Sequence, residues 1–338
     1  MFRVFIPRMS PIFEDVPALK SAKPDVIVSD AVVSDAIVSD AAHQASTMVV
    51  DGHVHIHPCF DVPVLLKSAL ANFRRNVSSS SQPFATSNSG SGVAFLLALS
   101  ESQGQNAFAR LRAKAQSKDD ALLENWQISL TDEADSLCAR RLSDDGSADG
   151  TLYILAGRQI VTREGIEVLA LATDRDFAEG HPMADTIQAV LSGGGISVIP
   201  WGFGKWLGKR GRRLAAWLRR QRHSLGVSPG PALFLADSSS RPTFWPEPAL
   251  FEQARQNGLS ILSGTDPFPF RSEMGRVGCA GFTVSGAFEP RRPAASLRQA
   301  LAGAVPSSLA VYGSPEPPFR CLRNQLAMQF IKRFRSHA

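Results

Sequence analysis

The chain has 338 residues, of which 44% are hydrophobic and 20% are charged, and its formal net charge is +5. This composition is typical of a globular protein and excludes a collagen-like or disulfide-dense chain. Four well-separated cysteines without a CxxC pair argue against a structural zinc knuckle and predict a cytoplasmic location, and no window is long and apolar enough for membrane insertion.

Residues 1–46 are predicted to form a low-complexity, disordered extension. They contain the segment PDVIVSDAVVSDAIVSD, in which Val-Ser-Asp recurs every five residues. A period of five fits neither a strand nor a helix. One folded domain is therefore expected over residues 47–338.

A strand is predicted where this domain begins, in the segment TMVVDGHVHIH. Side chains alternate along a strand, so His53, His55 and His57 leave the same face. Imidazoles are good ligands for zinc, manganese or iron, and three of them directly after Asp51 predict a metal site. A set of structural histidines is the alternative.

Strands and helices alternate along the rest of the chain. A serine-rich loop at 77–92 is followed by a buried strand (GVAFLLALSES), a charged helical stretch over 103–142, and two or three strands in TLYILAGRQIVTREGIEVLALAT. Then come a helix (MADTIQAVLSGGG), a strand (GISVIPW), a basic helix (205–222), a strand (PALFLADSSS), a helix (PALFEQARQNG) and a strand (LSILSGTD). This alternation indicates a parallel sheet or barrel whose site lies at the carboxyl ends of the strands.

Acidic residues stand at three of these predicted strand ends. Asp266 is expected to be a metal ligand, although a turn or helix-capping role is the alternative for this residue alone. Glu101 and Asp237 are candidate general bases.

Basic and aromatic residues near the same ends are candidates for substrate binding. Lys205 and Trp201 follow a predicted strand, and Arg241 lies in the polar segment DSSSRP. Lysine and arginine at such positions suit a phosphate or carboxylate of the substrate. The rest of the basic helix is expected to be a solvated face, with nucleic-acid binding as the alternative.

The order of these segments resembles the PHP (polymerase and histidinol phosphatase) domain family, a relative of the amidohydrolase metal-dependent barrels, over about residues 48–285. Asp51, His53 and His55 match its opening D-x-H-x-H motif. AGRQIVTREGIEVLAL parallels its Gly-x-Glu strand pair, and SGTDPFPFRSEMGRVG parallels its closing Gly-Ser-Asp-x-His and Gly-Arg motifs. The resemblance implies a distorted TIM-like (β/α)7 barrel that carries a metal-dependent hydrolase site.

Several ligand positions of that family are altered in this chain. Gln159 stands where the family has a bridging glutamate, Glu101-Ser102 replaces an Asp-His pair, Trp201 lies near a missing histidine, and Phe268 replaces the last histidine. The surviving ligands are His53, His55 and Asp266, with His57 as a further candidate. This set implies one divalent ion, at most two, rather than the three of the family.

The expected function is a metal-dependent hydrolase, most simply a phosphoesterase that attacks a small anionic substrate with a metal-activated water. Two alternatives follow from the same residues. One is a catalytically degenerate binding or regulatory protein of the PHP type, and the other is an amidohydrolase-type C–N hydrolase.

Overall fold

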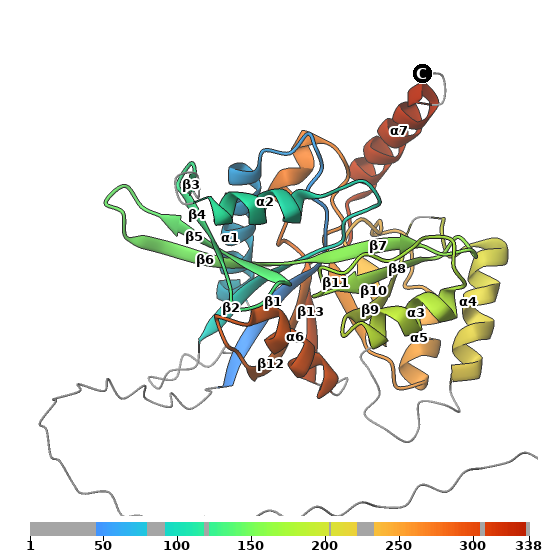
Figure 1. Cartoon of the computed structure of the whole chain (residues 1–338). Coiled ribbons are helices and arrows are strands. Elements are labelled where there is room, and N and C mark those ends of the chain that lie inside the picture. The colour runs from blue at the N-terminus through green and yellow to red at the C-terminus, as the bar shows by residue number, and fades with distance from the viewer. Residues whose placement is uncertain are drawn as a thin grey trace, which may run out of the picture. The chain divides into compact units, whose positions relative to one another are not determined.

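The computed structural model describes residues 45–79, 92–117, 122–202, 204–221, 233–304 and 308–335 (Figure 1). Within them, the strands form two sheets. The eight-stranded sheet has the order β13 (Leu309–Tyr312), β12 (Gly281–Ala287), β1 (Ala45–Val54), β2 (Val93–Leu99), β6 (Ala148–Leu155), β5 (Ser136–Leu142), β4 (Trp126–Leu130), β3 (Leu122–Leu123). The five-stranded sheet has the order β11 (Ile261–Gly264), β10 (Leu233–Ser238), β9 (Ile196–Pro200), β8 (Glu167–Leu171), β7 (Gly157–Val161).

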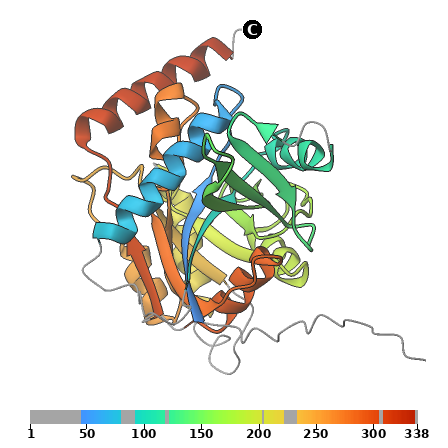
Figure 2. The same cartoon turned by 90° about the vertical axis from the view of Figure 1, so that its left-hand side faces the viewer.

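Helices cover the outer faces of both sheets. Helices α1 (Val62–Ser79) and α2 (Ala107–Gln116) pack on the eight-stranded sheet, and Figure 2 shows α1 lying across it. Helices α3 (Met183–Ser192), α4 (Gly208–Gln221) and α5 (Ala249–Gln256) pack on the five-stranded sheet. A short 3-10 helix, η1 (Arg271–Arg276), precedes β12, and α6 (Pro293–Ala302) and α7 (Pro318–Arg335) complete the described fold.

The inner faces of the two sheets share one apolar core. Along β1, Met48 and Val50 point into this inner core, whereas Val49 between them packs against α1 and α2 on the outer side. Strands of the five-stranded sheet contribute to the same inner core, for example through Leu169 and Val198. Such strict alternation is what a strand buried on both faces requires.

The expected (β/α)7 barrel is wrong, because the strands form two sheets that do not close into a barrel. Residues 122–155 are the main cause: the predicted helical stretch over 103–142 contains a helix only to Gln116. Beyond it, β3 to β6 pair antiparallel and extend one sheet outward, and β12 joins β1 antiparallel as well. These connections replace the helix crossovers that a parallel barrel needs.

The two sheets nevertheless approach each other closely at two places. The Glu101 backbone N–H donates to Gly157 O (3.1 Å), which brings the end of β2 to β7. The Asp266 N–H donates to His53 O (2.8 Å), which brings the end of β11 to β1. The predicted site residues lie around these two contacts.

The predicted extension over residues 1–46 lies outside the described residues except for its last two positions, which begin β1. Most of the predicted serine-rich loop is outside them too, since α1 runs to Ser79 and the description resumes at residue 92. In the described part of the chain, no helix combines the length and apolarity needed to cross a membrane.

Candidate metal centre

Strand β1 delivers two buried histidines to one point. His53 lies near the end of β1 and His55 follows it, and their side chains are almost fully buried. The Nε2 atoms of the two rings are 3.1 Å apart. The alternation of side chains along the strand puts both rings on one face, as the sequence predicts.

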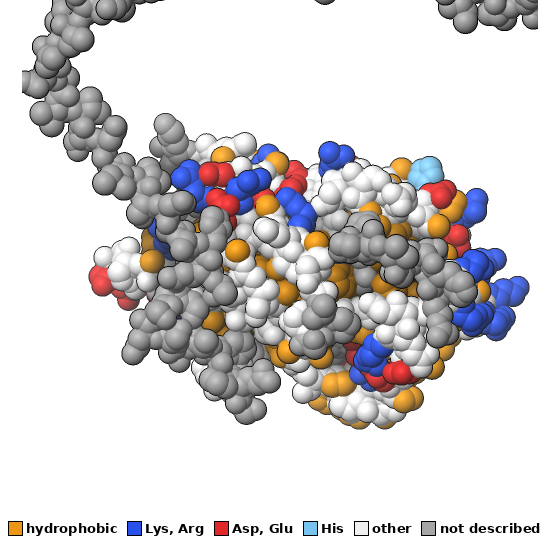
Figure 3. Space-filling view, turned by 90° about the horizontal axis from the view of Figure 1, so that it is seen from below, with side chains coloured by type: hydrophobic (Ala, Val, Ile, Leu, Met, Phe, Trp, Pro, Cys, Tyr) orange, Lys and Arg blue, Asp and Glu red, His pale blue; other side chains and the backbone are white. Residues whose placement is uncertain are grey.

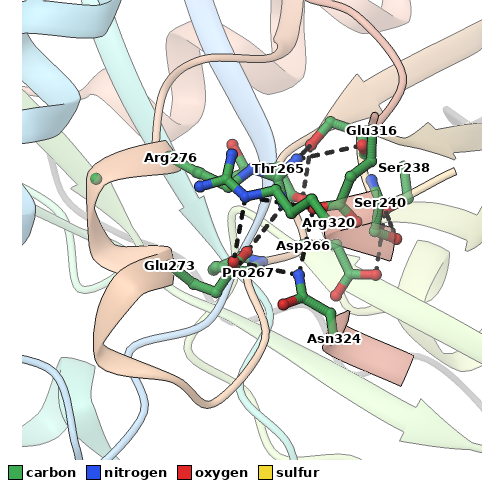
Figure 4. Close-up of polar contacts among 12 residues, drawn as sticks. Ser238, Ser240, Thr265, Asp266, Pro267, Glu273, Arg276, Glu316, Arg320 and Asn324 are labelled. Carbon is green, nitrogen blue, oxygen red and sulfur yellow. Dashed lines mark hydrogen bonds and ion pairs between the residues drawn. The ribbon is translucent and has the colours of Figure 1, made fainter. Parts of the chain in front are cut away.

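Asp266 reaches the same point from the five-stranded sheet. Its Oδ1 lies 3.6 Å from His53 Nε2 and 3.9 Å from His55 Nε2. Its backbone has a φ of +48°, a left-handed conformation that is uncommon for a residue other than glycine. The Ser238 hydroxyl donates to Asp266 Oδ2 (3.3 Å), and Figure 4 shows this contact at the end of β10. Strain of this kind is usually retained at functional positions.

These three side chains form a group that could hold a metal ion. One donor atom of each lies within 4.8 Å of the others. Ligand bonds of roughly 2.1 Å in a tetrahedral site place neighbouring donor atoms about 3.4 Å apart. The separations of 3.1, 3.6 and 3.9 Å between the donor atoms bracket that value.

The electrostatics of the group also fit a cation. Burial, with a smaller effect of the nearby His53, lowers the pKa of His55 to about 3, so its imidazole is neutral and keeps a lone pair at physiological pH. For Asp266, burial raises the pKa, but His53, His55 and Lys205 outweigh it and the pKa is lowered, which favours the carboxylate. His55 Nδ1 is buried without a hydrogen-bond partner.

His57 lies beside this group but its ring nitrogens are engaged elsewhere. His57 Nε2 donates to Pro267 O (2.9 Å), and Gln105 Nε2 lies 3.3 Å from His57 Nδ1. A neutral ring with Nε2–H uses both nitrogens in these two contacts. Its ring stacks on His55 at 5.3 Å, so the geometry places it as a neighbour that orients His55.

Gln159 contributes an oxygen to the edge of the group. It lies on β7, and its Oε1 is 3.3 Å from His53 Nε2. An amide oxygen is a neutral and weak ligand compared with a carboxylate. Gln159 thus lies at the candidate metal centre and contributes an uncharged donor.

The remaining predicted site residues are held in ion pairs or buried. Arg158 Nη1 lies 2.6 Å from Glu101 Oε2, and the Phe108 N–H donates to Glu101 Oε1. Asp237 is paired with Arg241 through three contacts of 2.8 to 3.0 Å.

Lys205 and Trp201 follow β9, as predicted. Lys205 is paired with Glu167 and also lowers the pKa of Asp266, which places its charge near the group. Trp201 is almost fully buried and packs edge-on against Trp245, so little of its ring is open to a substrate.

A cavity adjoins the metal centre on the side of Gln159. Its volume is about 300 Å³. Its lining includes Glu101, Gln105, Arg158, Gln159 and Asp176. Gln159 thus lies between this cavity and His53.

Two supporting residues, Thr265 and Gln105, were not recognised from the sequence. Asp51 is fully buried and accepts hydrogen bonds from the Thr265 N–H and the Gly278 N–H, each 2.8 Å long, and from the Thr265 hydroxyl. Gln105 orients His57. The sequence signal for Thr265 is its place directly before Asp266, but the partner of its hydroxyl lies 214 positions away.

The sequence matches no family model, and no curated protein is similar to it. Among solved structures, PsfC from Pseudomonas syringae PB-5123 is similar to this chain, with 16% identity and a TM-score of 0.47. The match covers 85% of this chain and 99% of PsfC. Function is therefore argued from the site itself.

Proposed function

We propose that this protein is a metal-dependent hydrolase that cleaves a small phosphoester with one divalent ion, zinc, manganese or iron. The observation that carries the proposal is the convergence of His53, His55 and Asp266 from two sheets on one point. The resemblance of the motif order to the PHP family supports the same class of reaction.

Three protein ligands leave a coordination position open, which is the arrangement of catalytic rather than structural zinc sites. A divalent ion bound there supplies a Lewis acid and lowers the pKa of a bound water towards ~7. The chain's own residues hold the donor atoms: Ser238 fixes the Asp266 carboxylate, and the contact with His57 fixes the ring of His55. Gln159 can orient a water or substrate oxygen from the adjoining cavity.

Two cations near the site would be the partners of an anionic substrate, although the carboxylates of Glu101, Asp176 and Glu179 line the same cavity. Lys205 lies close enough to lower the pKa of Asp266, and Arg158 lines the cavity beside Gln159. Both cations already have carboxylate partners, Glu167 and Glu101, so a phosphate would have to share them. Guanidinium and ammonium groups are common partners of phosphate oxygens.

The test combines metal analysis with turnover. The purified protein is loaded with zinc or manganese, its metal content is measured, and hydrolysis of p-nitrophenyl phosphate and bis-p-nitrophenyl phosphate is assayed. We expect about one ion per chain and metal-dependent hydrolysis of one probe. His53→Ala and Asp266→Asn should remove both, whereas His181→Ala, which changes an exposed histidine, should remove neither. The proposal would be contradicted if the protein stays folded after loading but binds no metal and hydrolyses neither probe.

A second candidate is a metal-binding protein without catalysis. The observation that favours it is that both candidate bases are occupied, Glu101 by Arg158 and Asp237 by Arg241. It predicts one bound ion without turnover of either phosphoester probe. Hydrolysis of an amide or cyclic amide probe instead would assign the C–N hydrolase alternative.

A further inference from the structure

Helix α4 carries more basic residues for its length than the other described helices. Its 14 residues include five arginines and one lysine and no acidic residue. These residues are Lys209, Arg210, Arg212, Arg213, Arg219 and Arg220. Figure 3 shows blue side chains gathered at the right-hand edge of the molecule, on the side where α4 lies in Figure 1.

None of these six side chains forms an ion pair with another residue that the structure describes. Within the described part of the chain, their one side-chain hydrogen bond joins Arg210 Nη1 to the Gly165 carbonyl at 3.4 Å. Arginines elsewhere are usually neutralised, as Arg158 is by Glu101 and Asp176, and Arg298 by Asp135. Repulsion between unpaired positive charges on one short helix is unfavourable. An anionic ligand that neutralises these charges would therefore bind there favourably.

A cavity of about 690 Å³ opens beside this helix. Its lining includes Arg213, Trp217 and Arg220 from α4 and Arg163 from the turn between β7 and β8. Arg163 has no ion pair among the described residues either. The acidic residue of the lining is Glu164, whose Oε2 accepts the Met183 N–H. The cavity therefore combines three free guanidinium groups with one half-buried indole.

We propose that α4 and this cavity, which we call the α4 surface, bind single-stranded nucleic acid. Arg213 and Arg220 are seven residues apart, which is about 10 Å along a helix axis, a span that covers several phosphates of a strand. Trp217 lies between them and offers an aromatic surface on which a base can stack. Guanidinium groups and an aromatic side chain are the two components that such sites combine.

The same observations argue against a lipid surface as the occupant. A helix that lies in a membrane interface buries an apolar face in the lipid. The apolar side of α4 is already used, because Leu214 and Leu218 are fully buried against the core that contains Phe251. A mononucleotide would use the cavity but leave Arg212 and Arg219, which do not line it, without a partner.

The test measures binding of the full chain to a fluorescent 12-nucleotide oligothymidine by anisotropy at several salt concentrations. We expect binding whose logarithm falls linearly with the logarithm of salt, with a slope of about −0.7 for each phosphate contacted. Arg213→Ala with Arg220→Ala should weaken binding about tenfold and make the slope less steep by about 1.4. Trp217→Leu should weaken binding with little change in slope, since stacking carries no charge.

The control is Lys67→Ala with Arg271→Ala, which removes two exposed cations away from α4 and should leave affinity and slope unchanged. Unchanged binding by the Arg213/Arg220 variant would overturn the proposal, and so would an equal loss in the control. Equal affinity for a 12-base-pair duplex, tighter binding of vesicles that contain phosphatidylserine, or complete competition by equimolar thymidine monophosphate would overturn the single-strand assignment.

Discussion

At the scale of single residues, the candidate metal centre depends on a buried carboxylate that is not itself one of the three ligands. Asp51 Oδ1 accepts the Thr265 N–H, and its Oδ2 accepts the Thr265 hydroxyl and the Gly278 N–H. Both oxygens are therefore occupied by donors. These bonds fix the residue that precedes Asp266 to the strand that carries His53.

Asp51→Asn is expected to lower the free energy of unfolding by about 1–3 kcal/mol, because the new amide NH2 must face an existing N–H donor. Metal affinity should fall as well, since Thr265 would shift and take Asp266 with it. Urea denaturation and a metal competition assay measure the two effects. Asp61→Asn, at an exposed residue, is the matched control. Equal stability of the two variants would contradict this role of Asp51.

The neutral donor Gln159 gives a second prediction at the same scale. Gln159→Glu places a carboxylate 3.3 Å from His53 Nε2 and should raise the affinity for zinc or manganese about tenfold or more, because an anionic ligand binds a divalent ion more strongly than an amide. Calorimetric titration of metal measures it. Gln105→Glu is the control, since Gln105 lines the same cavity but contacts His57. An equal gain in both variants would show only a general effect of charge.

Sequence reasoning predicted the residues of the candidate metal centre but not their environment. His53 and His55 follow from the period of two along one strand, and Asp266 from its place after an apolar run. Three further contacts depend on side-chain rotamers: those of both His57 nitrogens, the Glu101–Arg158 pair and the Asp237–Arg241 pair. The partners of His57 and Glu101 are also distant in the sequence, so neither strand pattern nor spacing could reveal these contacts.

At the scale of elements, the site requires β1 and β11 to approach closely. A methyl group at Gly264 would lie 2.4 Å from His53 N, and one at Gly52 would lie 2.8 Å from Ser263 O. Real side chains do not tolerate such distances to backbone atoms. Glycine at these two positions is therefore what allows ligands from different sheets to converge.

Gly264→Ala is expected to abolish high-affinity metal binding and to lower the free energy of unfolding by about 1–3 kcal/mol, as overpacking commonly does. Metal binding would be lost because the added methyl group forces His53 away from Asp266. Gly275→Ala is the control, because a methyl group there meets no atom within 4 Å. Metal titration and thermal denaturation of both variants measure the difference. Retention of wild-type metal affinity by Gly264→Ala would refute the close-approach argument.

Most strands and helices were predictable, and the failures have a physical reason. The strand that became β2 is a continuous apolar run, and β1, β9, β10 and β11 each contain a shorter one, which is typical of strands buried on both faces. In β4, by contrast, only Trp126 and Ile128 are buried. In the neighbouring strand β5, charged residues make the alternation of buried and exposed positions hard to recognise in the sequence. A strand with one exposed face is easily mistaken for a charged helix.

At the scale of the whole molecule, the candidate metal ligands come from both sheets. His53 belongs to the eight-stranded sheet, and Asp266 follows the last strand of the five-stranded one. A bound ion would therefore link the two sheets across the core that they share. This arrangement does not need the closed barrel that the motif order implied, because only the ends of β1 and β11 have to meet.

Metal binding should therefore raise thermal stability cooperatively. A saturating ion at about 100 times its Kd contributes roughly 2.7 kcal/mol. We expect a chelator to lower Tm and zinc or manganese to restore it in the wild-type chain, with no such change in His55→Gln. Differential scanning calorimetry measures it. A similar metal-dependent rise in the variant would place the ion elsewhere.

A buried ionic cluster connects helix α7 to the region of the site. Arg276 Nη1 lies 2.9 Å from Glu273 Oε2 and 3.3 Å from Glu316 Oε1, while its Nη2 lies 2.8 Å from Ser239 Oγ (Figure 4). Asn324 on α7 donates to both carboxylates at 3.2 Å. Ser239 adjoins Ser238, which contacts Asp266. The cluster thus holds α7, η1 and the end of β10 together.

Arg276→Met should lower the free energy of unfolding at pH 7 by about 3–5 kcal/mol, because it leaves two buried carboxylates without their main cation. Burial already raises the pKa of Glu316, and without Arg276 it would rise further. A folded-state pKa above the unfolded value means that the folded variant binds more protons, so its stability recovers as the pH falls. The loss of unfolding free energy relative to wild type should therefore be smaller at pH 5 than at pH 7 in urea titrations, and amide exchange should be fastest in α7.

Adding Glu273→Gln to Arg276→Met should restore part of the stability at pH 7. A deficit that is the same at both pH values and is not reduced by Glu273→Gln would mean that Arg276 acts through packing alone.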